Sequence, residues 1–303
     1  MKKKLIIAGG SGFIGKALSR YYLDQGFLVS VLTRGNSQLV DGVRFQNWDG
    51  KNIGEWAELL EGIDLLINLT GKSVDCRYTE ANKKLILSSR VDATIVLGKA
   101  ILQLKNPPKV WFNASTATIY DYSLTKAMTE DDGKIGSDFS MSVAKAWEEA
   151  FFTSVTPKTR KIALRISLVL GKGEGVLPVL TKLSKLGLGG YHGNGQQKFA
   201  WIHIQDLIRV IEFLKDKENM DAPVNCTSPS QITNQQFMKA LRNSLGISFG
   251  IPTPKIMLEI GSFFMQTESE LILKSRFVSP KRLLDNGFQF KFTNIDKALA
   301  NLI

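Results

Sequence analysis

The chain has few residues that could hold a metal ion or form a disulfide, and it has no long apolar run. Its 303 residues include two cysteines and two histidines, and Cys76 and Cys226 stand far apart without a CxxC pair. We therefore expect free thiols in a reducing compartment and no zinc site. No apolar run reaches the roughly 18 residues that a membrane helix needs. The apolar stretch of MKKKLIIAGG is too short for a signal peptide. These absences predict a cytoplasmic protein without a membrane anchor.

Positive charge is in excess, but it is not concentrated in one segment. The formal net charge is +11, and the lysines and arginines are spread along the chain, with no arginine-rich run between aromatic residues. This distribution argues against a nucleic-acid partner and fits a protein that binds an anionic small molecule. A basic scaffold that binds nucleic acid is the alternative, and its binding would be sensitive to salt.

The first part of the chain alternates β-rich apolar runs with helical patterns, which is typical of βαβ units. The runs are apolar on both faces, as in a parallel sheet covered by helices. We predict an α/β fold with a Rossmann-type, doubly wound parallel sheet in residues 1–171, to which later segments return. The predicted strands occupy residues 4–9, 27–35, 42–50, 63–71, 109–120 and 161–171, and the two longest helices in this part occupy 79–104 and 139–152.

After Gly171 the pattern becomes mostly helical and is punctuated by proline. We interpret residues 172–303 as a smaller substrate lobe that ends in a helical segment at 250–303. Two helix starts are predicted within it from residues that favour the N-cap position. Asp206 is the predicted cap of one helix, and Thr233 or Asn234 is the predicted cap of another.

The segment IIAGGSGFIG carries the clearest binding signal. Its glycines form G-x-x-G-x-x-G between a predicted strand and a predicted helix, which is the context of a dinucleotide-binding turn. Glycine there permits a tight turn and lets backbone N–H groups and the helix N-terminus reach a diphosphate. A glycine-rich turn without a ligand is the alternative. The predicted cofactor contacts in this segment are Gly9, Ser11, Gly12, Phe13, Ile14 and Gly15.

The end of the second predicted strand indicates which dinucleotide binds. An acidic residue about 20 positions after the glycines would bind the ribose 2′-hydroxyl of NAD. The chain instead has Thr33 and Arg34 at this place. Because the arginine fork matches a phosphate, these residues favour NADP over NAD. The alternative for Arg34 is a solvated loop cation.

Further cofactor contacts are predicted where the third and fourth strands end. Trp48 and Asp49 follow the third strand and are predicted to lie near the adenine, with core packing as the alternative for Trp48. Asn68, Thr70 and Gly71 follow the fourth strand. Ligands of such sheets bind outside the carboxyl ends of the strands, so we place these three residues at the cofactor crevice.

Nearly the whole chain carries, in order, the segments GGSGFIG, LTR, WDG, NLTG, RYTEANKKLILSSRV, AKAWEEA, GNGQQKFAWIHIQDL and SRFVSPKRLLDNGFQF. Together these segments resemble the extended short-chain dehydrogenase/reductases, the relatives of sugar epimerases and dehydratases. Within this superfamily, the segments are similar to an atypical subgroup, the NAD-dependent epimerase/dehydratase-like proteins. This subgroup has a short C-terminal domain of unassigned role and is sometimes mislabelled as cell-division inhibitors. The resemblance implies an NADP-binding Rossmann core and a substrate cleft under the C-terminal lobe.

In that superfamily, catalysis uses a serine or threonine after the fifth strand and a Y-x-x-x-K motif on the next helix. The tyrosinate exchanges a hydroxyl proton while hydride moves to or from the nicotinamide. The lysine lies one helical turn further on, lowers the tyrosine pKa and binds the ribose. The resemblance gives the hydroxyl role to Thr116 or Ser115 and the lysine role to Lys145. Met141 stands in place of the tyrosine, and a methionine cannot exchange a proton.

Other groups near the predicted cleft could replace the missing proton donor. Tyr120 and Tyr122 follow the fifth strand, and packing beneath the cleft is the alternative for Tyr120. Ser140 and Ser142 flank Met141, although one step along a helix turns a side chain by about 100 degrees. For four further side chains, the sequence leaves open whether they act in the site or only support the fold. They are His192, His203, Arg165 and Arg276.

These features favour an NADP-dependent oxidoreductase or epimerase-like enzyme that acts on a small polar or sugar-like substrate. In this hypothesis Lys145 anchors the ribose, Thr116 or Ser115 orients a carbonyl, and another donor or water moves the proton. Met141 favours an alternative, which is a catalytically silent NADP-binding sensor or regulatory protein. The expected partners are a small-molecule substrate and a second copy in a homodimer, with no nucleic acid and no membrane.

Overall fold

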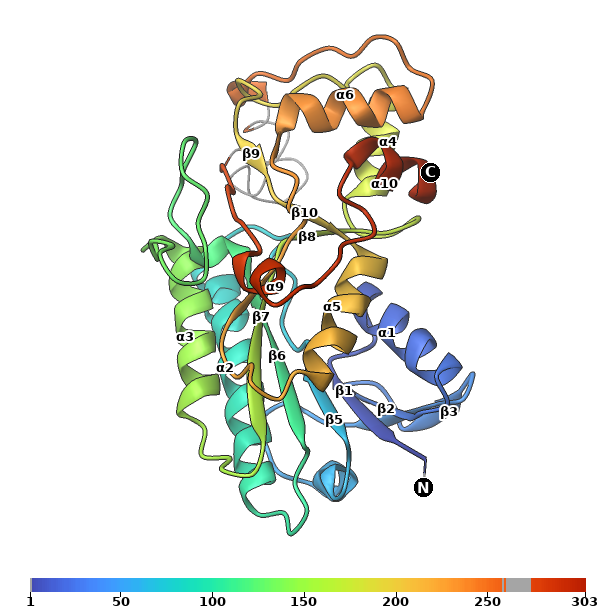
Figure 1. The fold of residues 1–303 in the computed structure, drawn as a ribbon, viewed down its shortest axis with the longest axis vertical. Helices are drawn as coiled ribbons and strands as arrows, with labels where there is room; N and C mark the ends of the chain where they lie inside the picture. The colour runs from blue at the N-terminus through green and yellow to red at the C-terminus, as the bar shows by residue number, and fades with distance from the viewer. Residues whose placement is uncertain (1, 258, 260–273) are drawn as a thin grey trace.

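The structure, a computed structural model, describes residues 2–257, 259 and 274–303. Its centre is an eight-stranded sheet (Figure 1). From one edge to the other, the strands are β11 (Val224–Cys226), β7 (Arg160–Ile166), β6 (Val110–Thr116), β5 (Leu65–Asn68), β1 (Lys4–Ala8), β2 (Leu28–Thr33), β4 (Val43–Asn47) and β3 (Gln38–Val40). All neighbours pair in parallel, except that β3 runs antiparallel to β4. This order confirms the predicted doubly wound α/β fold.

All six predicted strands are present, and they place the crevice of the sheet. β1 lies between β2 and β5, and its last residue, Ala8, pairs with Leu32 and Asn68. The strand order therefore reverses between β1 and β5, which is where ligands of such sheets bind. Two strands of this eight-stranded sheet were not predicted. β3 is short and exposed, and β11 comes from beyond residue 172 and extends the sheet beside β7.

Helices cover both faces of the sheet. α1 (Phe13–Asp24) and α5 (Ile204–Asp216) pack on the face that carries Leu5 and Ile7, whereas α2 (Glu80–Leu102) and α3 (Phe139–Thr153) pack on the face that carries Ile6 and Ala8 (Figure 1). Successive strand residues point to opposite faces, so an all-apolar strand such as β1 is buried on both sides. Two 3-10 helices, η1 (Glu55–Leu60) and η2 (Ala117–Ile119), follow β4 and β6. Within the described residues, no helix combines the length and the apolar character needed to cross a membrane.

A third apolar cluster forms a lobe at one end of the molecule, at the top of Figure 1. Its helices are α4 (Leu177–Lys185), α6 (Asn234–Ser244) and α10 (Ile295–Leu302). Two short strand pairs accompany them, β8 (Leu168–Leu170) with β10 (Trp201–His203) and β9 (Lys198–Phe199) with β12 (Ile232–Thr233). Thr233 caps α6 in a reciprocal capping box with Gln236, which confirms one of the two predicted caps.

The predicted cap of α5 is wrong, because Asp206 has a different task. The N-cap is His203, whose Nδ1 accepts a hydrogen bond from the Gln205 N–H at 3.1 Å. The buried Asp206 carboxylate accepts hydrogen bonds from the N–H groups of Lys291 at 2.9 Å and Phe292 at 2.8 Å. Asp206 therefore ties a distant segment to the first turn of α5, a partner that the local sequence could not reveal.

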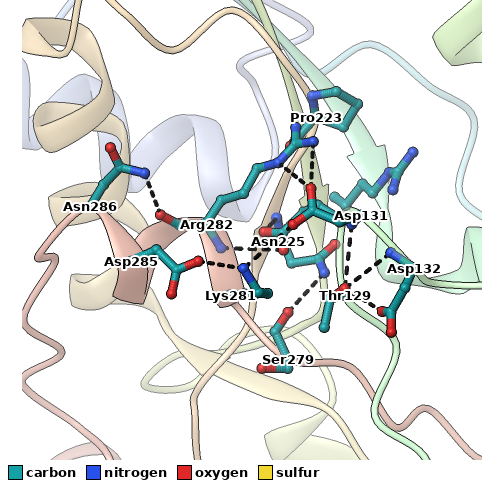
Figure 2. A network of polar contacts seen from close by, with 12 residues as sticks. Thr129, Asp131, Asp132, Pro223, Asn225, Ser279, Lys281, Arg282, Asp285 and Asn286 are labelled. Carbon is teal, nitrogen blue, oxygen red and sulfur yellow. Dashed lines mark hydrogen bonds and ion pairs between the residues drawn. The ribbon is translucent and has the colours of Figure 1, made fainter.

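Helix α9 (Lys281–Asp285), which precedes the C-terminal helix α10, is held to the sheet domain by polar contacts, which Figure 2 shows. The Arg282 guanidinium donates to the Asp131 carboxylate at 2.9 Å and to the Pro223 carbonyl at 2.9 Å. On the edge strand β11, the Asn225 side chain donates to the Ser279 carbonyl at 2.8 Å. These bonds fasten residues 279–286 to β11 and to the loop that carries Asp131.

We predict that His203 makes the protein sensitive to acid. The ring is 1 % exposed and stacks on Phe292 with centroids 3.8 Å apart. Burial lowers the pKa of His203 to about 4. Between about pH 6.5 and 4, His203 is therefore protonated in the unfolded chain but neutral in the folded protein. The free energy of unfolding should therefore fall as pH drops from about 6.5 towards 4.

His203→Asn keeps a good N-cap acceptor but does not titrate. Urea unfolding at several pH values should show a shallower decline for this variant than for the wild-type protein, although its stability at pH 7 is lower because the ring stack is lost. An unchanged slope between pH 6.5 and 4 would contradict the assignment.

Candidate dinucleotide and catalytic site

The turn between β1 and α1 leaves no room for a Cβ at Gly9, Gly10 and Gly15, whereas Gly12 faces open space. Gly9 has a φ of 71°, and a Cβ there would lie 2.7 Å from the Thr70 Cα. A Cβ on Gly15 would overlap the backbone of Gly10. A Cβ on Gly12, in contrast, would meet no atom within 4 Å. The packing of the fold therefore does not require a glycine at position 12.

The N-terminus of α1 is free to bind an anion. Gly12 is its N-cap, no side chain caps it, and its first turn has no acidic residue. Helices α2, α3, α5 and α6 are each capped by a side chain, from Thr79, Asp138, His203 and Thr233, whereas α4 shares with α1 the lack of a side-chain cap. The first N–H groups of α1 thus lack side-chain acceptors beside the open space at Gly12, as a diphosphate requires. Nearby, the enclosed Thr70 Oγ1 also lacks a hydrogen-bond partner among the described residues.

Thr33 is the last residue of β2, and Arg34 follows it in the loop. Arg34 is exposed, and within the described part of the chain no carboxylate pairs with its guanidinium. The Asn47 side chain on β4 donates to the carbonyls of Arg34 at 3.2 Å and Gly35 at 2.9 Å. This amide fixes the loop, so Thr33 and Arg34 stand at the carboxyl end of β2 with the arginine side chain available.

Trp48 and Asp49 are used within the protein. Trp48 is 3 % exposed and packs edge-to-face on Trp56, with centroids 5.2 Å apart, which agrees with the core-packing alternative. The Asp49 carboxylate accepts the N–H groups of Lys51 at 2.8 Å and Asn52 at 2.9 Å. These bonds lower the pKa of Asp49 to about 2. Both side chains therefore take part in contacts within the protein, and their predicted place near the adenine stays a prediction.

Asn68 positions the loop after β5 rather than facing open space. It is fully buried, and its Nδ2 donates to Asn113 Oδ1 at 2.7 Å and to Thr94 Oγ1 at 3.2 Å. Its Oδ1 accepts the Thr70 N–H at 3.0 Å. The predicted crevice residues thus divide into a buried support, Asn68, and two loop residues, Thr70 and Gly71, beside the glycine turn.

Of the two predicted hydroxyls after β6, Thr116 lies at the end of the strand and Ser115 lies beneath it. The half-buried Thr116 accepts the Thr118 N–H at 3.1 Å, which leaves its hydroxyl proton available. The buried Ser115 donates to Glu148 at 2.6 Å. Thr116 therefore fits the predicted hydroxyl role, whereas the position of Ser115 does not support it.

Tyr120 belongs to a buried polar network and not to an open cleft. Its hydroxyl donates to Asn225 at 2.9 Å and accepts from Arg165 at 2.6 Å. Arg165 also binds Glu148 through two hydrogen bonds of 2.8 Å each. Burial raises the pKa of Tyr120. This position does not support the prediction that Tyr120 replaces the missing proton donor, and it shows that Arg165 faces a core carboxylate.

Lys145 and Met141 share one side of α3 but differ in exposure. Met141 is 1 % exposed and packs against Gly136, whose missing Cβ makes room for the sulfur. Lys145 is exposed, and no carboxylate pairs with it in the described residues. It lines a cavity of about 320 Å³ together with Ile119, Ile135, Glu148, Glu149 and Arg165. Lys145 therefore borders a cavity, and the residue four positions before it is Met141 instead of a tyrosine.

The remaining polar side chains near α3 form a separate group. Tyr122 and Lys274 both bind the Asp138 carboxylate, which also caps α3 through the Met141 N–H at 2.9 Å. Arg276 lies over the Tyr122 ring, 5.4 Å from its centroid. Tyr122 is therefore held at the start of α3 by its hydroxyl and by its ring face.

A family model described as the NAD dependent epimerase/dehydratase family matches residues 5–226. The chain belongs to this family. A second model, described as a domain of unknown function (DUF1731), matches residues 253–302. These matches confirm the resemblance on which the expected site residues were placed, including the short C-terminal domain.

The similar proteins extend over the whole chain. An epimerase family protein of Bacillus subtilis, YfhF, is 31% identical over 300 residues, covering 99% of this chain and 97% of its own. The mouse epimerase family protein SDR39U1 is 31% identical and covers 99% of each chain. A crystal structure of human SDR39U1 with NADPH superposes with a TM-score of 0.87 at 30% identity, covering 99% of this chain and 98% of that one.

The glycine turn gives a matched pair of stability predictions. Gly15→Ala should lower the free energy of unfolding by about 1–3 kcal/mol, because its Cβ would overlap the backbone of Gly10. Gly12→Ala should cost less than about 1 kcal/mol, since its Cβ enters open space and only the cap preference changes. Denaturant unfolding of both variants measures the difference, and equal losses would show that Gly12 is also required by the fold.

Proposed function

We propose that the protein binds NADP across the carboxyl ends of β1, β2 and β5 and uses it as an oxidoreductase or epimerase on a small polar or sugar-like substrate. The observation that carries this proposal is the uncapped N-terminus of α1 above the open space at Gly12. Family membership supports it, as does the similarity to human SDR39U1, which was crystallised with NADPH.

The residues present fit the parts of the dinucleotide. The N–H groups at Gly12 and in the first turn of α1 would hold the diphosphate. Arg34, with Thr33 beside it, would hold the 2′-phosphate through charge-assisted hydrogen bonds. The enclosed Thr70 Oγ1 would gain a partner on the β5 side. When bound, the nicotinamide supplies a hydride donor or acceptor.

The protein's own contribution to chemistry would come from two side chains. Thr116 would orient a substrate carbonyl or hydroxyl with its available O–H, and Lys145 would supply a positive charge near the ribose. Met141 supplies no proton, so we infer that water carries the proton that tyrosine carries elsewhere in the superfamily.

A second function is a catalytically silent NADP-binding sensor. The observation that favours it is the complete burial of an apolar side chain at position 141, packed against Gly136 where a proton donor would be needed. This alternative keeps every cofactor contact and removes the turnover.

We predict measurable turnover that depends on Thr116 and Lys145. With NADPH, a panel of small carbonyl compounds and nucleotide sugars should yield at least one substrate. Thr116→Val and Lys145→Ala should each lower kcat/KM by about 10² or more, the size expected for loss of a positioned polar group. Lys158→Ala, an exposed lysine at the opposite end of the sheet, serves as the control. NADPH binding without any turnover would favour the silent alternative, and turnover independent of Lys145 would remove its assigned role.

We predict that Arg34 selects NADPH over NADH. Arg34→Ala should weaken NADPH binding by roughly 10- to 100-fold, which corresponds to the loss of charge-assisted hydrogen bonds, and should leave NADH binding nearly unchanged. Isothermal calorimetry with both coenzymes measures this. Arg20→Ala, which removes an exposed arginine paired with Asp24 on α1, is the matched control. Equal weakening of both coenzymes would show that Arg34 does not read the 2′-phosphate.

A further inference from the structure

Arg90 is a half-buried cation on α2 that has no counter-ion in the described part of the chain. Its Nη1 donates to the carbonyls of Lys72 at 3.0 Å and Ile86 at 2.9 Å. For its Nε and Nη2, the described residues provide no hydrogen-bond acceptor. Arg165, the buried arginine of the polar network, has in contrast a carboxylate partner in Glu148. One edge of the Arg90 guanidinium is therefore left without a partner.

The position of this guanidinium is fixed by its neighbours. Its Cζ lies 5.2 Å from the centroid of the Trp147 ring, and the Trp147 Nε1 donates to Thr94 Oγ1 at 3.0 Å. A Cβ on Gly71 would lie 2.9 Å from Cζ, 3.1 Å from Nη2 and 3.2 Å from Nε. Glycine at position 71 thus makes room for the unpartnered edge of Arg90. The side chain is preorganised by an aromatic ring, two carbonyls and a glycine.

A chain of contacts places Arg90 beside the glycine turn. Gly9 packs against Thr70, Gly71 is the next residue, and the Arg90 guanidinium lies against Gly71. The crevice at the strand reversal is therefore bordered by two positive groups, the N-terminus of α1 on the β1 side and Arg90 on the β5 side. Burial lowers the pKa of Arg90 to about 10, which leaves it charged at neutral pH. A desolvated cation without a counter-ion is costly, and an anion beside it removes that cost.

We propose that Arg90 binds an oxyanion, a phosphate or a carboxylate, in the crevice beside Gly71. The inference rests on the proposed function, because the same crevice would hold NADP. The oxyanion has two sources, the diphosphate of the coenzyme or an acidic group of the substrate. The planar fork of arginine suits both, since each presents two oxygens in one plane.

The experiment compares Arg90→Gln with the wild-type protein by calorimetry and salt titration. Three probes are used: NADPH, adenosine 2′-monophosphate, which lacks both phosphates of the diphosphate, and inorganic phosphate added to the NADPH-loaded protein. If the coenzyme is the source, the variant binds NADPH at least about tenfold more weakly, with a smaller salt dependence, and binds the monophosphate as before. If the substrate is the source, NADPH affinity is kept, and phosphate binding to the loaded protein is lost.

Ser89→Ala is the matched control for a structural role, because the Ser89 Oγ accepts the Lys72 N–H at 2.9 Å and supports the same loop without a charge. If this variant reproduces the effects of Arg90→Gln, or if Arg90→Gln changes neither arm, the inference is overturned. If the glutamine variant does not fold, the same three binding measurements are made with Arg90→Lys, which keeps the positive charge but loses the planar guanidinium. Absence of NADPH binding by the wild-type protein would overturn the proposed function first, so the two failures are distinguishable.

Discussion

The close backbone packing at the β1–α1 turn is the constraint on which the site depends. Gly9 in the left-handed region brings the turn against Thr70, and Gly15 brings α1 against Gly10. Because these contacts leave no room for a Cβ, the start of α1 is fixed above the strand reversal of the sheet. Arg34 follows β2 on one side of that point, and Arg90 lies against Gly71 after β5 on the other.

Two networks of buried polar side chains hold the part of the site that follows β5 and β6 in place. Asn68 and Asn113 join β5 to β6, and Thr94 joins both strands to α2. A separate network runs from Ser115 through Glu148 and Arg165 to Tyr120 and Asn225. Such networks are stable in a low-dielectric interior only when their members are satisfied, so their hydroxyls are committed to structure. This is why two of the four expected catalytic side chains face inward and only Thr116 and Lys145 remain.

The site that results is richer in positive charge than in proton donors. The positive groups are the uncapped N-terminus of α1, Arg34, Arg90 and Lys145, whereas the residue one helical turn before Lys145 is the buried and apolar Met141. Such a site suits a polyanionic dinucleotide whichever of the two proposed functions holds.

The sequence by itself determined the fold and the binding turn, because both depend on local patterns. Apolar runs between helical segments specify a parallel sheet, and glycine at fixed spacing after a strand specifies the turn. Only the tertiary structure decided what individual polar residues do, because their partners are distant in the chain. Asp206 ties residues 291 and 292 instead of capping α5, Tyr120 meets a strand some hundred residues later, and Gly71 makes room for Arg90. No local pattern encodes which buried group will be satisfied by a distant one and which will be left for a ligand.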